Sequence, residues 1–395
     1  MDSDRLEQLQ QALGSRGLDG WLFYDFRLSN PIAYRVLGLS TTLLFTRRWY
    51  YWLPAEGEPA RLVSAIEAGN LDSLPGRKHL YRSRQELAES LARMLEGSTT
   101  IAMEYSPLAE LPVVSRVDAG TVEYLRGMGK TVVSSADLVQ AFEAPLSEHA
   151  FATHLEAERR LAAIHAATLD YIRNSVSAGH TLTEYDVQQH MLALYEQHDL
   201  FCDHGPDVAV GPNASNPHYA PTAERSLPLR EGDLLLIDWW GKLPEPGAIY
   251  ADYTWVGVVG SSVPGRYREV FDVVRGARDA AIEFIDRHVR AGTTLEGWQV
   301  DDVARAYITE RGYAEYYIHR TGHNIGVDLH GPGANLDNFE THDTRQLLPH
   351  TLCSVEPGIY LPEFGIRSEV NVYIGDGSIE VTGRPVQQGL PAILS

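Results

Sequence analysis

The residues best suited to chemistry are three histidines in one short stretch and two glutamates that follow it. The stretch reads HRTGHNIGVDLHGPG and contains His319, His323 and His330, while Glu356 lies in SVEPGIY and Glu369 in IRSEV. A single imidazole is more often a hydrogen-bonded core residue than a ligand. Imidazoles and carboxylates together suit divalent transition metals, so the combination predicts a metal centre.

Two aspartates upstream extend this set. Asp238 follows an apolar run in DLLLIDWWG, and Asp252 lies in the β-rich segment YADYTWVGVV, so each carboxylate would need a partner once buried. Alternation along a strand places Asp252 and Thr254 on one side, and it places Glu369 and Asn371 on one face of a strand through IRSEVNVYI. Carboxylates that converge from separate strands repel one another unless cations neutralise them. The alternative for Asp238 is a helix or turn cap.

The first part of the chain must fold around other residues. Residues 1–145 alternate helical and strand patterns without a phosphate-binding glycine loop, a cysteine cluster or a histidine pair. The expected strands are 20–25, 41–46, 49–54, 60–65, 99–105 and 131–135, and the expected helices are 5–16, 83–97 and a segment near Val122. We therefore expect an α/β domain that acts as a scaffold or in dimerisation.

The boundary is expected in FEAPLSEH, where Pro145 stops one helix and Ser147 can cap the next. A long helix follows, and its core-facing stripe is expected to contain Leu161, Ile164, Ala167 and Tyr171. Three more helices are expected over 183–197, 266–289 and 295–311. Strands then carry the candidate ligands while helices cover one face, which is an α+β layering.

Taken together, these residues resemble those of the dinuclear metallopeptidases with the pita-bread fold, and within that family the prolidases and aminopeptidases P. There, two aspartates on neighbouring strands, a histidine in a GH-x-x-G turn, a glutamate in an EPG turn and a glutamate in an R-x-E strand hold two metal ions. Counterparts occur here in the same order, namely Asp238, Asp252, His323, Glu356 and Glu369. The resemblance implies a creatinase/prolidase-like α/β domain over 1–145 and a pita-bread α+β catalytic domain over 146–395. The turn reads GHNIG rather than GHGIG, so Asn324 is expected to take a backbone conformation that glycine adopts more easily.

The resemblance also implies roles for residues around the ligands. His218 in GPNASNPHY and His330 in VDLHG match substrate-binding histidines and would hydrogen-bond the scissile carbonyl or its oxyanion. Glu356 would move a proton to the leaving nitrogen. His319 would line the pocket or hold the residues that line it in place, and Arg367 would orient carboxylates. The expected catalytic set is therefore His218, His319, His330, Glu356 and Arg367.

Four carboxylates and one imidazole form a hard ligand set, which favours two Mn²⁺ or Co²⁺ ions and leaves Zn²⁺ open. By resemblance, Asp252 and Glu369 would bridge the two ions. Asp238 would hold one ion, and His323 and Glu356 would serve mainly the other. The implied reaction is hydrolysis of the bond between an N-terminal residue and proline.

Substrate length separates a prolidase, which cleaves Xaa-Pro dipeptides, from an aminopeptidase P, which cleaves longer peptides. We expect dipeptides, since a loop rich in tryptophan and proline from Trp239 to Gly247 could narrow the entrance. The free carboxylate of proline would need a cation, for which His342, Arg345 and Arg367 are candidates. A metal-free enzyme of the creatinase type and a non-catalytic binding module are less consistent with five intact ligands. A methionine aminopeptidase usually lacks the separate N-terminal domain.

Composition narrows the remaining classes of function. The formal net charge of −20 argues against nucleic acid or an anionic membrane as the main partner, because either would need a basic surface. Two cysteines, Cys202 and Cys353, are too few for a disulfide framework and fit a reducing, cytoplasmic setting. The N-terminus does not have the pattern of an export signal, and no run of about 18 apolar residues occurs. We expect a homodimer that acts on small peptides with proline in second position.

Overall fold

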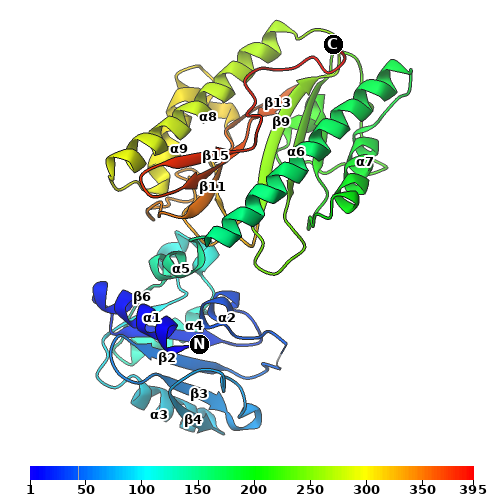
Figure 1. Cartoon of the computed structure of the whole chain (residues 1–395). Coiled ribbons are helices and arrows are strands. Elements are labelled where there is room, and N and C mark those ends of the chain that lie inside the picture. Colours follow the sequence, from blue (N-terminus) through cyan, green and yellow to red (C-terminus); the bar gives the residue numbers. More distant parts are fainter. Residues whose placement is uncertain (43) are drawn as a thin grey trace. The chain divides into compact units, whose positions relative to one another are not determined.

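The computed structural model describes residues 1–42 and 44–395, which form two compact units, Met1–Glu143 and Ala144–Ser395. The boundary expected from the sequence was at residue 145. Figure 1 labels many of the elements of each unit.

The first unit is built on one six-stranded sheet with the strand order β4-β3-β2-β1-β5-β6. β1 pairs antiparallel with β2 and parallel with β5, so the sheet is mixed. One apolar cluster lies under α1, α2 and α5, and a second lies under α3 and α4 on the other face. The strands are β1 (Gly20–Asp25), β2 (Trp49–Pro54), β3 (Ala60–Ser64), β4 (Arg77–Tyr81), β5 (Thr100–Met103) and β6 (Thr131–Ser134). The helices are α1 (Ser3–Ser15), α2 (Pro31–Leu37), α3 (Arg84–Met94), α4 (Ala119–Gly127) and α5 (Ala136–Glu143).

The strand expected over residues 41–46 is not present in its described part. Residue 43 lies outside the described residues, and residues 44–46 are not in a strand. Phe45 is instead buried against the rings of Tyr34 and Trp49, at centroid distances of 5.2 and 6.4 Å. A short apolar run that serves an aromatic cluster cannot be told from a strand by its pattern alone.

The first long helix of the second unit begins at the cap that the sequence predicts. The hydroxyl of Ser147 accepts a hydrogen bond from the backbone of Ala150 at the start of α6, and Thr183 caps α7. The helices are α6 (Glu148–Ser177), α7 (Glu184–Gln197), α8 (Gly265–Ala291) and α9 (Gly297–Thr309). The predicted stripe of α6 is buried at Leu161 and Ile164, and then continues at Thr168 and Ile172 instead of Ala167 and Tyr171. No described helix, α6 and α8 included, is both long and apolar enough to cross a membrane.

The strands of the second unit form three sheets, with the orders β7-β8-β9, β10-β11-β14-β15 and β12-β13. Their bounds are β7 (Asp207–Val210), β8 (Leu234–Gly241), β9 (Ala251–Val258), β10 (Asn324–Ile325), β11 (Thr351–Val355), β12 (Gly358–Leu361), β13 (Phe364–Arg367), β14 (Val370–Ile374) and β15 (Ile379–Thr382). The single strand expected through 366–374 is therefore interrupted, because β13 pairs with β12 whereas β14 pairs with β11. At the break the backbone N–H of Glu369 donates to the carbonyl oxygen of Thr254 at 3.2 Å, so the chain turns towards β9.

Helices flank these strands, with α6 and α7 on one side and α8 and α9 on the other (Figure 1). α6 and α7 share an apolar cluster with Leu235 and Ile237 of β8. α8 and α9 share another with Leu234 and Leu236 of the same strand. The face of β8 that carries Leu234 and Leu236 also carries Asp238, since side chains alternate along a strand.

Candidate metal centre

The pairing of β8 with β9 places two aspartates on one face of their sheet. Asp238 lies opposite Thr254, and Trp240 lies opposite Asp252. Asp238 and Asp252 are therefore diagonal neighbours on the same face, as the alternation of side chains predicts. Asp252 is only 5% exposed, so its carboxylate is largely removed from water.

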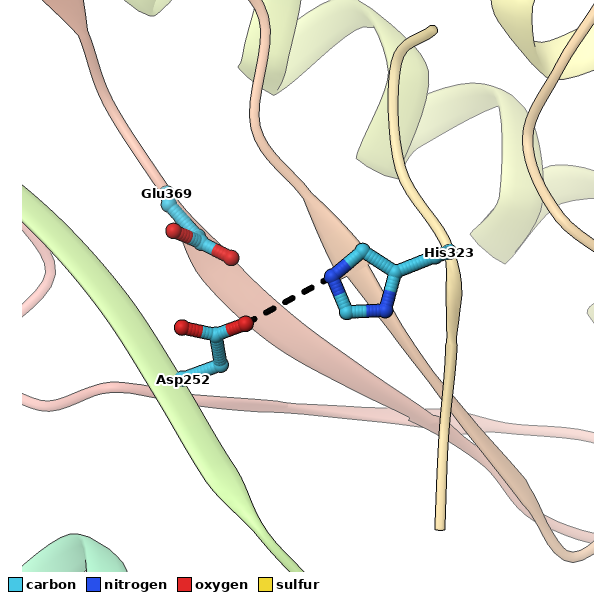
Figure 2. Close-up of side chains that lie close together, drawn as sticks. All are labelled: Asp252, His323 and Glu369. Carbon is cyan, nitrogen blue, oxygen red and sulfur yellow. Dashed lines mark ion pairs between the residues drawn. The ribbon is translucent and has the colours of Figure 1, made fainter. Parts of the chain in front are cut away.

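His323, Glu356 and Glu369 approach these aspartates from the other sheets. The backbone N–H of His323 donates to the hydroxyl of Ser354 in β11 at 2.9 Å, which fixes the histidine beside that strand. Its Nε2 lies 3.5 Å from Asp252 Oδ2 and 3.4 Å from Glu356 Oε1. Figure 2 shows Asp252, His323 and Glu369 directed at a common space. One potential ligand atom from each of these three residues lies within 4.8 Å of the other two.

The hydroxyl of Thr254 connects the carboxylates to one arginine. Its Oγ1 accepts a hydrogen bond from Arg367 Nε at 2.9 Å and lies 2.8 Å from both Asp238 Oδ1 and Glu369 Oε2. A hydroxyl carries one proton and can donate to only one of these oxygens. Arg367 Nη2 also donates to Asp238 Oδ2, at 2.5 Å.

The residues present fit divalent cations. Glu369 Oε1 is buried without a hydrogen-bond partner among the described residues. Burial, together with the charge of Asp238, raises the pKa of Asp252 well above its ordinary range. Burial and the neighbouring carboxylates, Asp252 first, raise the pKa of Glu369 in the same way, and burial raises the pKa of Glu356. One arginine cannot neutralise four carboxylates, so the set fits positive charge bound between them.

A second chain of hydrogen bonds runs from Arg367 through Tyr360 to His319. Arg367 Nη1 donates to Tyr360 Oη at 2.9 Å, and Tyr360 Oη lies 2.8 Å from His319 Nε2. His319 Nδ1 lies 2.6 Å from the carbonyl oxygen of Arg320, which assigns the ring proton to Nδ1 and leaves Nε2 to accept from the tyrosine hydroxyl. Burial and the charge of Arg367 lower the pKa of His319 to about 3, consistent with a neutral ring. His319 thus supports Tyr360 through this hydrogen bond.

The two histidines expected to bind substrate lie at the edge of this cluster. The ring of His330 is 4.3 Å from that of His323 between centroids, in an edge-to-face arrangement, and His330 is an exposed residue. His218 is also exposed and follows the short helix η4 (Gly211–Ser215). The charge of His323, burial and the charge of His218 all lower the pKa of His330, so both other histidines are near it.

Asp207 is a further carboxylate near the site that the sequence did not suggest. It is the first residue of β7 and lies opposite Asp238 in the sheet. Burial, with the charge of Asp238, raises the pKa of Asp207 to about 8. Its only sequence signal is an acidic residue at the start of the apolar run DVAV, and its position beside Asp238 follows from strand pairing.

The loop expected to narrow the entrance is shorter than predicted. Trp239 and Trp240 are in β8 and are 3% and 9% exposed, because they pack as strand residues. Asn324 also differs from expectation, since it lies in β10 without a positive φ. Its side chain donates to the carbonyl oxygen of Leu352 at 2.8 Å and accepts from the backbone of Gly333 at 2.9 Å.

The candidate cations for a substrate carboxylate are already engaged. Arg345 is 3% exposed, and its Nη2 lies 2.6 Å from Asp343 Oδ2. His342 is exposed and its Nδ1 lies 2.7 Å from Asn338 Oδ1. Arg367 is committed to Asp238, as described above.

The fold and the site together define a class of protein, one in which strands of an α+β unit hold a carboxylate-rich centre suited to divalent metal ions. Comparison with known proteins then identifies the family. Residues 155–376, more than half of the chain, match metallopeptidase family M24. The chain belongs to metallopeptidase family M24, as the resemblance predicted.

Sequence similarity to curated relatives covers part of each protein. The Xaa-Pro dipeptidase of Lactobacillus helveticus is 37% identical over 164 residues, which are 41% of this chain and 40% of that protein. The Xaa-Pro dipeptidase of Pyrococcus furiosus is 31% identical over 172 residues, which are 42% of this chain and 43% of that protein. The matched region thus spans less than half the length of these relatives.

Structural similarity covers nearly the whole chain. The dipeptidase PepE from Mycobacterium ulcerans superimposes with a TM-score of 0.73 at 21% identity, covering 99% of this chain and 98% of that one. The prolidase from Thermococcus sibiricus gives 0.65 at 20% identity and covers 99% of both chains. These likenesses confirm the predicted fold class, an α/β N-terminal domain followed by an α+β pita-bread domain.

Proposed function

We propose that the chain hydrolyses the peptide bond between an N-terminal residue and proline, with Xaa-Pro dipeptides as its preferred substrates. The observation that carries the proposal is the buried cluster of Asp252, His323 and Glu369, with Asp238 and Glu356 beside it. Family membership and the names of the similar dipeptidases support the same reaction. The proposal extends to two divalent ions, with Mn²⁺ favoured by the hard oxygen ligands.

The five candidate ligands would divide between the two ions as the resemblance implies. Asp252 and Glu369 are central in the cluster and suit the bridging role, which would also give Glu369 Oε1 the partner that it lacks. Bound there, the ions would polarise the scissile carbonyl and lower the pKa of water to near neutrality.

Glu356 is the proposed proton carrier of the reaction. Its Oε1 lies 3.1 Å from Ser354 Oγ and 3.4 Å from His323 Nε2, so the side chain is held at the edge of the cluster. Burial raises the pKa of this carboxylate, which favours its taking up a proton, here from water on the way to the proline nitrogen. His218 and His330, at the exposed rim, would hydrogen-bond the substrate carbonyl. Arg367 and His319 are positioning residues, since they act through Asp238 and Tyr360.

Arg320 is the proposed partner of the free proline carboxylate. Its guanidinium is partly exposed, and its Nη1 lies 3.9 Å from Glu340 Oε2, so the two side chains form only a weak ion pair. Burial lowers the pKa of His323, and the nearby charge of Arg320 lowers it further, so this cation is close to the cluster. Neither Arg345 nor Arg367 has a comparably available guanidinium.

The remaining parts of the proposal concern the whole chain. We propose that residues 1–145 form a non-catalytic domain and residues 146–395 the catalytic one, in a cytoplasmic homodimer. The two compact units of the structure support the division into domains. The small number of cysteines supports the cytoplasmic setting.

The deciding experiment compares kcat/KM for a Xaa-Pro dipeptide, its C-terminal amide and a Xaa-Pro-Xaa tripeptide. A dipeptidase that reads the carboxylate should prefer the free dipeptide, because the amide leaves Arg320 without its ionic partner. If the amide or the tripeptide is cleaved as well as the dipeptide, the chain is a Xaa-Pro aminopeptidase instead.

A further inference from the structure

Ser368 and Glu369 lie between β13 and β14 and belong to neither strand. Their positions therefore depend on contacts other than a strand ladder. The backbone N–H of Ser368 lies 3.4 Å from the carbonyl oxygen of Pro357, which is long for a hydrogen bond. Ser368 is nevertheless fully buried, so its hydroxyl needs a partner inside the protein.

Arg278 of α8 supplies that partner. It is 0% exposed, and its Nη1 donates to Ser368 Oγ at 2.8 Å and to the carbonyl oxygen of Gln387 at 3.0 Å. Its Nε and Nη2 both donate to Asp279 Oδ1, at 2.9 and 2.7 Å. The guanidinium is therefore fixed by a half-exposed carboxylate on one side and contacts the break between β13 and β14 on the other.

The second acceptor of Arg278 leads to the strand that carries Asp252. Gln387 is 2% exposed and exchanges two hydrogen bonds with the backbone of Val256 in β9. Its Oε1 accepts from the N–H at 3.2 Å, and its Nε2 donates to the carbonyl oxygen at 2.6 Å. One guanidinium thus joins the segment that contains Glu369 to β9.

Ser368 and its two neighbours make contacts with different elements. Arg367 Nε and Glu369 Oε2 both contact Thr254 Oγ1, at 2.9 and 2.8 Å, on the side of the candidate metal ligands. The hydroxyl of Ser368 lies between them in sequence and contacts α8 instead. Because peptide units are planar and the three residues are consecutive, a contact that holds Ser368 also restricts the backbone from which both neighbours project.

Packing alone does not explain a charged residue at this place. Nearby buried residues of α8 are Val274, Ala277 and Ala281, which belong to an apolar cluster. Burying a guanidinium costs free energy unless its donors are satisfied, and an aliphatic residue would fill the space without that cost. The hydrogen bonds of Arg278 are therefore what distinguishes it from its neighbours.

We propose that Arg278 is a positioning residue of the metal centre, which acts through Ser368 to hold Glu369 and Arg367 in place relative to β9. The inference rests on the proposed function, because it takes Glu369 as a ligand of a metal ion. Without the contact, Ser368 is free to shift, and the carboxylate of Glu369 meets Asp252 less accurately. Groups that orient metal ligands in this way typically change metal affinity by about 10–100-fold.

The test measures Mn²⁺ affinity by calorimetric titration of the chelator-treated full chain. Ser368→Ala removes the acceptor and should weaken Mn²⁺ binding by about tenfold. Arg278→Met removes the donors and should cause a loss of at least that size, whereas Arg278→Lys keeps a buried donor and should recover part of it. The double variant should lose no more than Arg278→Met alone, because both changes remove the same contact.

Val274→Ala is the matched control, one helical turn before Arg278 and equally buried. It should lower the midpoint of thermal unfolding of the metal-free chain without changing Mn²⁺ affinity, which separates lost positioning from lost stability. Parent-like affinity in Ser368→Ala, which is the smaller change and decides the question if Arg278→Met does not fold, would overturn the inference. An equal loss of affinity in Val274→Ala, or additive losses in the double variant, would also overturn it. If the parent itself binds no Mn²⁺, the proposed metal centre fails and the inference fails with it.

Discussion

Replacing Thr254 by valine tests the idea that one hydroxyl holds the candidate metal ligands in place. Valine has nearly the same shape as threonine but can neither accept from Arg367 nor donate to Asp238 or Glu369. Arg367 is 3% exposed, so its Nε would lose its acceptor in a buried place. That loss costs about 1–3 kcal/mol.

Two measurable consequences follow from Thr254→Val. Removing a group that orients ligands typically lowers metal affinity by about 10–100-fold. A loss of about 2 kcal/mol in unfolding free energy should lower the midpoint of thermal unfolding by roughly 4–8 °C for a unit of this size. Thr254→Ser keeps the hydroxyl and serves as the matched control.

The assay is a calorimetric titration of chelator-treated protein with Mn²⁺, combined with thermal unfolding of the same samples. The serine variant should behave like the parent. Parent-like Mn²⁺ affinity and thermal midpoint in Thr254→Val would refute the reasoning, because the carboxylates would then be positioned by other contacts.

Three further predictions address the ligands, the substrate and pH. Asp252→Asn and His323→Ala should each abolish turnover and leave the circular dichroism spectrum unchanged, since they remove ligands without opening a large cavity. Turnover of Asp252→Asn within about tenfold of the parent, which is ~1.4 kcal/mol in barrier height, would contradict the bridging role of Asp252. Arg320→Ala should raise KM for the free dipeptide by about tenfold, as expected for one charge-assisted hydrogen bond, while leaving the amide unaffected, and Arg320→Lys should recover part of the loss; an equal change for both substrates would exclude the carboxylate contact. Burial raises the pKa of Glu104 to about 7 in the folded chain, above the value of about 4.3 in the unfolded chain. The contribution of Glu104 to stability is therefore complete below a pH of about 4.3 and is lost as the pH rises to about 7. The unfolding free energy of the metal-loaded chain should fall by up to about 4 kcal/mol over that interval, and an unchanged slope in Glu104→Gln would show that another group is responsible.

The sequence predicted most local features, because caps and motifs are read from neighbouring residues. Ser147 caps α6, and the segments around His323, Glu356 and Glu369 suggested a metal centre before any pairing was known. The structure brings His323 and Glu369 together with Asp252. The individual ligand and catalytic roles stay predictions.

Features that depend on strand pairing were not predictable from the pattern. Thr254 contacts both Asp238 and Glu369 because β8 pairs with β9 in one particular register and the chain breaks between β13 and β14. Asp207 lies beside Asp238 for the same reason. Trp239 looked like part of a loop because proline and glycine follow it closely, yet its burial against α6 extends the strand.

The most direct test of the account is turnover of a Xaa-Pro dipeptide by one preparation before chelation, after dialysis against a chelator, and after readdition of Mn²⁺, with the metal content measured each time. The account predicts that activity disappears with the metal and returns as about two equivalents of Mn²⁺ bind per chain. Full activity in protein shown to contain no metal would contradict it.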